Sequence, residues 1–234
     1  MIRREPIPFT SRQSKAQWIL SLLWIPVHIF GLPSLLVLLF PQIGESTLNL
    51  ACYGTGAAFM LLTQFGFLRR DFDPLCDRPV RVLFEVLIAY GAMLLFNMAV
   101  SGLLLAVMET VENPNNAAVV EMAQVDSGPV AALAVFLAPL VEELMFRAGI
   151  FGALRHKNRL LAYLVVIVLF PVYHVLGYAL NDPMTWIYVL QYIPVSYLLC
   201  RVYERTNTIW ASIAFHMLVN FIALNALTTL EKLL

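Results

Sequence analysis

Long apolar segments dominate this sequence and set the first limit on its fold. Of the 234 residues, 60% are hydrophobic and only 13% are charged. This composition excludes an ordinary soluble globule and is typical of a polytopic membrane protein, in which each crossing helix needs about 20 apolar residues. Segments that reach or approach this length lie at 17–40, 46–68, 80–108, 129–154, 160–180, 184–200 and 207–230. The predicted fold class is therefore all-α, a polytopic bundle of about seven transmembrane helices.

The basic residues alternate between the loops that join these segments. Lys and Arg collect on the cytoplasmic side of membrane proteins. In this chain they precede the first segment or lie in every second loop: Arg3, Arg4, Arg12, Lys15, Arg69, Arg70, Arg78, Arg81, Arg155, Lys157, Arg159, Arg201 and Arg205. The charged residues of the 109–128 loop are all acidic (Glu109, Glu112, Glu121 and Asp126). Lys232 is the one basic residue on that side. We expect a cytoplasmic N-terminus and a C-terminus on the opposite side.

Composition also narrows the domain organisation and the class of partner. No internal repeat or long linker divides the chain, so the prediction is one integral-membrane domain over residues 1–234, with a motif-bearing core at 129–225. A formal net charge of zero gives no support for nucleic-acid binding. The cysteines are scattered and lack metal-ligand or redox spacing: Cys52, Cys76 and Cys200.

Three ionisable residues interrupt the apolar segment at 129–154. Charge in the hydrocarbon region costs several kcal/mol unless it is paired or solvated. Glu143 and Arg147 are four residues apart and can pair on one helix face. Glu142 lies about 100° around the helix, without that partner. One carboxylate would then be structural and the other available for chemistry; the alternative is a packing salt bridge with an extra Glu at the bilayer edge.

Other polar side chains fall at the same predicted depth on two further segments. At 1.5 Å per residue, Glu142 and His174 each lie roughly 20 Å of helix from a basic loop. His216 and Asn220 share one helix face at roughly 16 and 22 Å. A shared water-filled cavity near the bilayer centre explains this match better than packing does. Isolated polar residues elsewhere in the spans are expected to serve packing: His28, Gln64, Asn97 and Asn225.

Two prolines lie next to these polar residues. Pro139 is three residues before Glu142, and Pro171 is three residues before His174. Proline removes a helix hydrogen bond and tends to kink the helix. We expect kinks at both positions, which would open space beside the polar side chains.

This set of residues suits hydrolysis. A Glu and a His can hold and deprotonate a water molecule, and His216 with Asn220 can donate hydrogen bonds to an oxyanion. Two carboxylates and two histidines could also ligate zinc, which leaves a metal site open on this reasoning. No Ser-His-Asp or Gly-x-Ser-x-Gly arrangement is present.

The motifs resemble those of the CPBP (Abi/CAAX protease) family of intramembrane glutamic endopeptidases. They occur in the family's order on separate apolar segments: Glu142-Glu143-x-x-x-Arg147, Phe170-x-x-x-His174 and His216-x-x-x-Asn220. The resemblance covers roughly residues 129–225. It implies an all-helical bundle, a cavity open toward the cytoplasm and the lipid, and catalysis without a metal or other cofactor.

The resemblance also implies roles for individual residues. Glu142 would be the general base that activates water, helped by His174. His216 and Asn220 would form the oxyanion site. The supporting residues would be Glu143, Arg147 and Phe170.

The leading functional hypothesis is an endopeptidase that cleaves membrane-associated peptides or proteins within the membrane of a prokaryotic cell. Its expected partners are that substrate and the lipid bilayer, with no nucleic acid. The alternative is a non-catalytic membrane protein acting in immunity or as a regulatory scaffold. A third hypothesis, a proton pathway through Glu142, His174 and His216, needs water access from both faces, and the apolar outer halves of these helices count against it.

Overall fold

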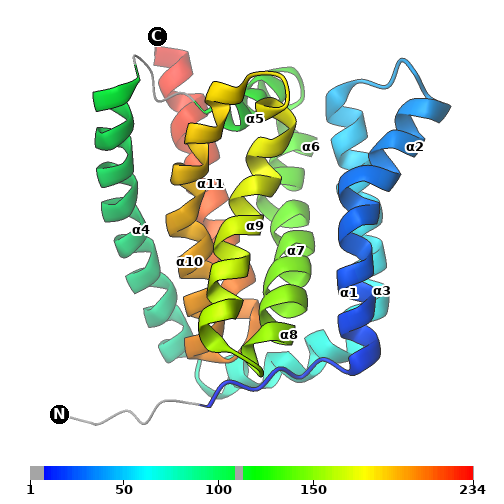
Figure 1. Ribbon diagram of the computed structural model, residues 1–234, viewed down its shortest axis with the longest axis vertical. Coiled ribbons are helices and arrows are strands. Elements are labelled where there is room, and N and C mark those ends of the chain that lie inside the picture. The colour runs from blue at the N-terminus through cyan, green and yellow to red at the C-terminus, as the bar shows by residue number, and fades with distance from the viewer. Residues whose placement is uncertain (1–7, 109–112, 234) are drawn as a thin grey trace.

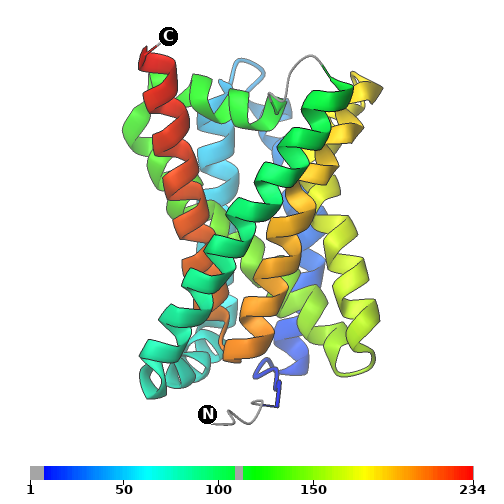
Figure 2. The ribbon, with the colours of Figure 1, turned by 90° about the vertical axis from the view of Figure 1, so that its left-hand side faces the viewer.

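The computed structural model describes residues 8–108 and 113–233, and over these residues its regular structure is entirely helical (Figures 1 and 2). The elements are α1 (Lys15–Pro26), η1 (Val27–Gly31), α2 (Leu32–Leu39), α3 (Glu45–Asp77), α4 (Pro79–Val107), α5 (Pro114–Val125), α6 (Ser127–Ala132), η2 (Leu133–Leu137), α7 (Ala138–Glu142), η3 (Glu143–Phe151), α8 (Gly152–Arg155), α9 (Arg159–Ala179), η4 (Pro183–Tyr188), α10 (Val189–Thr206) and α11 (Ile209–Leu233). Some residues used to predict the topology lie outside the described ranges: Arg3, Arg4, Glu109 and Glu112.

Six helical stretches among the described residues are long and apolar enough to cross a membrane. They are Lys15–Leu39, Glu45–Asp77, Pro79–Val107, Ser127–Arg155, Arg159–Ala179 and Ile209–Thr229. Each overlaps one of the predicted spans, so the prediction of a polytopic helical bundle is confirmed. The main chain continues helically through the two π-helical stretches of the fourth span, η2 and η3.

The remaining predicted span, 184–200, differs from the structure in its bounds and in its polarity. Residues 183–188 form the 3₁₀ helix η4, and α10 begins at Val189 and ends at Thr206. α10 is not among the six apolar stretches. It nevertheless runs the height of the bundle and packs against α4, α9 and α11 (Figures 1 and 2). Since protein surrounds it, α10 can carry polar side chains that a lipid-facing helix could not.

The segment at 109–128 was predicted as a loop, and that prediction was wrong for residues 114–125. Residues 114–125 form α5, whose N-cap Asn113 accepts a hydrogen bond from the Asn115 backbone N–H. A proline at the first turn also suits a helix start. The acidic residues of the 109–128 segment did not suggest a helix. α5 lies across one end of the bundle, opposite the end where the described chain starts (Figure 2).

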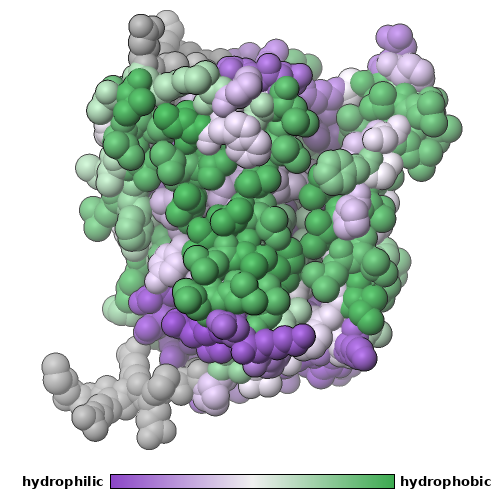
Figure 3. Space-filling view, in the orientation of Figure 1, coloured by the Kyte–Doolittle hydropathy of each residue, from purple (hydrophilic) through white to green (hydrophobic). Residues whose placement is uncertain are grey.

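The surface of the bundle is apolar over its middle. Figure 3 shows a broad hydrophobic face above a hydrophilic band at the lower end. Large side chains stand exposed on the outer helices, such as Leu62 on α3 and Leu95 on α4, at 83% and 71% exposure. A soluble monomer does not expose so many, whereas a bilayer accommodates them. The chain is therefore an integral membrane protein.

Ion pairs connect neighbouring helices at the lower, hydrophilic end of the bundle. We call residues 69–81, 155–159 and 201–208, which form this end, the basic end. Glu204 on α10 accepts hydrogen bonds from Arg155 and Arg159, at 2.5 and 2.8 Å. Arg205 donates two hydrogen bonds to Glu85 on α4, at 2.7 and 2.8 Å. The described chain starts near this end and finishes near the other, where α5 lies (the α5 end; Figures 1 and 2).

Asp71 on α3 joins the N-terminal segment to the start of α11. Its carboxylate is completely buried and accepts hydrogen bonds from Arg12 Nη1, at 2.8 Å, and from the Ile209 backbone N–H. Its carbonyl oxygen accepts from Thr208 Oγ1 at 2.6 Å. A carboxylate at a helix N-terminus is favoured by the free N–H groups and the helix dipole. Asp71 therefore sets the position of α11, which carries His216 and Asn220.

We expect Asp71→Ala to lower the free energy of unfolding by roughly 2–3 kcal/mol, because hydrogen bonds to a charged group are lost and Arg12 loses its partner. Unfolding in detergent, followed by circular dichroism, measures this change. Asp73→Ala is the matched control, since Asp73 is exposed on the same helix. Equal effects of the two substitutions would contradict the role assigned to Asp71.

Candidate functional site

Glu142 and Glu143 sit where the helix changes its winding. Glu142 is the last residue of α7 and Glu143 is the first of η3, a π-helical stretch; both side chains are buried. A second π-helical stretch, η2, comes directly before α7. Wide turns of this kind are frequent at functional sites. Here one π-helical stretch ends five residues before Glu142, and the other begins at Glu143.

The wide turn before α7 leaves one backbone carbonyl without a helical partner. The Ala138 N–H bonds to the carbonyl of Leu133, five residues back. The carbonyl of Ala134 would need the N–H of residue 139, and Pro139 has none. Asn220 Nδ2 on α11 donates to this carbonyl at 2.8 Å. The prediction of a distortion at Pro139 agrees with this arrangement, whereas α9 continues as an α-helix through Pro171.

Three polar side chains surround the Glu142 carboxylate. Tyr53 on α3 donates its hydroxyl proton to Glu142 Oε1 at 2.8 Å. The Nε2 atoms of His174 and His216 lie 3.6 and 3.8 Å from Glu142 Oε2. The structure thus brings the predicted carboxylate and both predicted imidazoles together from three helices.

The other ring nitrogen determines the protonation of each histidine. His174 Nδ1 lies 2.8 Å from the carbonyl oxygen of Phe170, which can only accept. His216 Nδ1 lies 2.8 Å from Glu143 Oε1, a carboxylate oxygen paired with Arg147. Both Nδ1 atoms must therefore carry the proton. In the neutral rings, both Nε2 lone pairs then point toward Glu142.

Glu143 anchors a buried network behind His216. Its Oε1 also accepts from Arg147 Nη1 at 3.0 Å, and its Oε2 accepts from Ser212 Oγ at 2.5 Å. Arg147 is completely buried. Its Nη2 lies within 3.5 Å of the hydroxyl and the carbonyl oxygen of Ser196 on α10. The ion pair expected from the four-residue spacing is present, and it supports the imidazole of His216.

Phe170 packs beside both this network and the histidines. Arg147 Cζ lies 4.1 Å from the centre of its ring, a favourable cation–π arrangement. The ring centres of His174 and His216 are 4.4 and 5.8 Å away. Phe170 therefore packs against both imidazoles and covers the guanidinium group.

A cavity of about 470 Å³ ends at these residues. Among its lining side chains are Glu142, Phe170, His174, His216 and Asn220. Asn220 lines the cavity. One N–H of its side-chain amide donates to the Ala134 carbonyl, and the second N–H remains available as a donor. Among the described residues, no group of three or more His, Cys, Asp or Glu side chains has an arrangement suited to a metal ion.

Two tyrosines of this site were not predicted from the sequence. Tyr53 bonds Glu142, and the Tyr173 hydroxyl lies 2.6 Å from that of Tyr53. Since Tyr53 gives its one proton to Glu142, Tyr173 donates to Tyr53. Depth could have revealed Tyr53: it lies 16 residues before Arg69, about 24 Å of helix, close to the level of Glu142. His28, which we expected only to pack, is buried with its ring 4.8 Å from that of Tyr53.

Removing one partner of the buried Glu143–Arg147 pair should destabilise the protein more than removing both charges. We expect Arg147→Met alone to cost about 3–5 kcal/mol, because it leaves a buried carboxylate without its cation. The double variant Glu143→Gln/Arg147→Met should be the more stable of the two. Unfolding in detergent measures both changes. Arg159→Met is the control, since its surface pair contributes only about 0–1 kcal/mol; a double variant no more stable than Arg147→Met would contradict the prediction.

Comparison with known proteins supports the interpretation of the motifs. The family model described as "type II CAAX prenyl endopeptidase Rce1-like" matches residues 125–222. The UPF0177 protein YxdF of Lactococcus lactis is 36% identical over 101 residues, or 42% of this chain and 51% of that protein. The chain thus spans about half the length of the curated relative it matches, and no solved structure matches it significantly. Residues 125–222, which carry all the motif residues, are thus similar to the CPBP family of CAAX-protease-like membrane proteins.

Proposed function

We propose that this protein is an intramembrane glutamic endopeptidase that cleaves membrane-associated peptides or proteins in a prokaryotic membrane. The observation that carries the proposal is the approach of two histidine Nε2 atoms to one oxygen of Glu142, at the end of a cavity. Three proton acceptors converge there, at distances that suit a bridging water. The match to the CAAX prenyl endopeptidase model supports this activity, and the relative from Lactococcus lactis supports a prokaryotic source.

In the proposed first step, Glu142 acts as the general base. A substrate water donates one hydrogen bond to Glu142 Oε2 and another to His174 Nε2. These two hydrogen bonds orient the lone pair of the water oxygen. As Glu142 takes its proton, the water oxygen bonds the peptide carbonyl carbon, and the carbonyl π electrons move to the oxygen. General-base catalysis of this type contributes about 10²–10⁴-fold to the rate.

The oxyanion then needs hydrogen-bond donors. The free N–H of Asn220 can supply one. His216 supplies the second once its Nε2 has taken a proton from solvent, since its Nδ1 already donates to Glu143. When the intermediate collapses, the C–N bond breaks and the leaving amine takes the proton held by Glu142. The products are a free carboxylic acid and a free amine, and the sequence of steps requires no metal.

Glu142→Gln should reduce peptide cleavage by about 10²–10⁴-fold while the protein still folds, because the amide is isosteric but cannot accept the water's proton. The measurement is hydrolysis of a fluorogenic peptide panel, with and without a lipid tail, by purified protein in EDTA. Glu121→Gln, an exposed acid on α5, is the control.

Loss of wild-type cleavage in EDTA, restored by zinc, would instead assign Glu142, His174 and His216 to a metal site. If no peptide is cleaved and a cellular phenotype survives Glu142→Gln, the non-catalytic immunity or scaffold role replaces the proposal.

We assign Tyr53 as a positioning residue for Glu142. Its hydrogen bond holds Oε1, which turns Oε2 toward the two imidazoles. Tyr53→Phe should lower kcat about tenfold, since a hydrogen bond to a charged group contributes about 1.5–3 kcal/mol. KM should change little. Tyr197→Phe, in α10 and outside the cavity lining, is the matched control. A kcat equal to that of wild type would remove Tyr53 from the mechanism.

A further inference from the structure

The cavity reaches Glu142 from one side of the bundle. On α3 its lining begins at Glu45, at the α5 end, and stops at Tyr53, while α3 continues for 24 residues toward the basic end. On α9 the lining comprises Phe170, His174 and Tyr178, the part of the helix nearest the α5 end. The described lining residues all lie at the level of Glu142 or between it and the α5 end.

The exposed lining residues show where this cavity opens. They are Glu45 on α3, Asn116 on α5 and Ala223 on α11. Each lies between the level of Glu142 and the α5 end. The mouth is therefore on the α5 side of Glu142, where α5 crosses the bundle (Figure 2).

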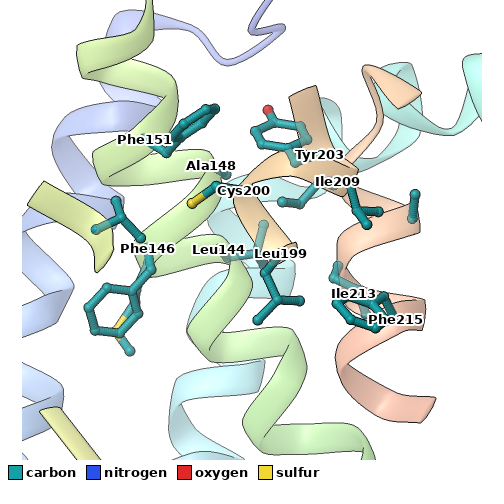
Figure 4. Close-up of a cluster of buried hydrophobic side chains, with 14 of the residues drawn as sticks. Leu144, Phe146, Ala148, Phe151, Leu199, Cys200, Tyr203, Ile209, Ile213 and Phe215 are labelled. Atoms are coloured by element: carbon teal, nitrogen blue, oxygen red, sulfur yellow. The ribbon is translucent and has the colours of Figure 1, made fainter. Parts of the chain in front are cut away.

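The other half of the bundle is filled. Between Glu142 and the basic end, apolar side chains of η3, α10 and α11 interlock (Figure 4). Each is at most 2% exposed: Leu144, Phe146, Ala148, Phe151, Leu199, Cys200, Tyr203, Ile209, Ile213 and Phe215. The Glu143–Arg147 pair belongs to the same helical stretch, η3, and is completely buried. Among the described residues, this packing blocks a comparable path to Glu142 from the basic end.

Charge relates these two ends to the two sides of the membrane. The basic end holds nine of the 15 Lys and Arg residues, and the N-terminal segment bonded to it adds Arg12 and Lys15. Loops rich in Lys and Arg stay in the cytoplasm. The cavity mouth then faces away from the cytoplasm. This is the opposite of the cytoplasmic opening that the family resemblance implied.

The mouth suits an uncharged, extended peptide. The described lining holds the side-chain amides of Asn49, Asn97, Asn115, Asn116 and Gln191, together with Glu45 and no Lys or Arg. Asn115 Nδ2 already donates to Tyr192 and Gln191 Oε1 accepts from Asn113, so each keeps only part of its hydrogen-bonding capacity for a ligand. A primary amide offers both donors and acceptors, as a peptide backbone does. From Glu45 to Tyr53 is about 12 Å along α3. An extended chain of about four residues covers that distance.

We propose that the substrate is a peptide segment on the non-cytoplasmic side of the membrane, which enters at the α5 end and places its cleaved bond about four residues deep. The proposal rests on the peptidase function proposed above. It disfavours a cytoplasmic prenylated tail and favours the non-cytoplasmic end of a membrane-anchored peptide.

The direct test is labelling from one side. Asn116→Cys places a thiol at the mouth, and the native Cys76, exposed near the basic end, is the internal reference. Intact spheroplasts expressing this variant are treated with a membrane-impermeant maleimide, and each thiol is quantified by mass spectrometry. We expect the thiol at position 116 to react before permeabilisation and Cys76 only afterwards. Protection of position 116 in intact spheroplasts, or labelling of Cys76 there, overturns the proposal.

A second measurement separates this proposal from the peptidase proposal. A peptide is first given to the protein in detergent, where both ends are accessible, and then outside sealed vesicles whose orientation the labelling has established. Cleavage in detergent and in vesicles with the α5 end outward supports the proposal. Cleavage in detergent and only in vesicles with the basic end outward overturns it. No cleavage in detergent counts against the peptidase, while the labelling still decides the orientation of the mouth.

Discussion

The buried guanidinium group of Arg147 sets the conditions for the whole site. A charge that is completely enclosed by helices must be paired, and Glu143 pairs it at 3.0 Å. The same carboxylate accepts a hydrogen bond from the Nδ1–H of His216, which turns the Nε2 atom toward Glu142. Phe170 covers the guanidinium and packs against both imidazoles. One buried ion pair thus determines a histidine tautomer and the position of its ring.

The backbone around the site is shaped by a second constraint, the need to satisfy every buried carbonyl in a bilayer. The wide turn at η2 and the missing N–H of Pro139 leave the Ala134 carbonyl without a helix partner, and Asn220 supplies it. Asn220 therefore joins α11 to the fourth span and also lines the cavity. Its structural bond and its proposed catalytic hydrogen bond use different protons of one amide.

The two halves of the bundle differ in a way that matters for function. Toward the basic end, dense apolar packing and ion pairs such as Arg205–Glu85 hold the turns together. Toward the α5 end, amide side chains surround open space that leads to Glu142. Water and a peptide can reach the carboxylate from one side, while the other side keeps the helices in position. This asymmetry suits a hydrolase better than a pathway that conducts protons across the membrane.

The sequence alone determined the helical membrane class, because apolar length is a local property, and it located most of the site. Spacing of four residues predicted the Glu143–Arg147 pair, and matched depth predicted that Glu142, His174 and His216 would meet. Only the tertiary structure decided what depends on contacts between distant segments. Tyr53 donates a hydrogen bond to Glu142, which is 89 residues away in the sequence. Asn220 donates one to the Ala134 carbonyl, which is 86 residues away. The bounds of α10 were predicted incorrectly for the same reason. Contacts with the surrounding helices, and not its own hydropathy, make its place in the bundle favourable.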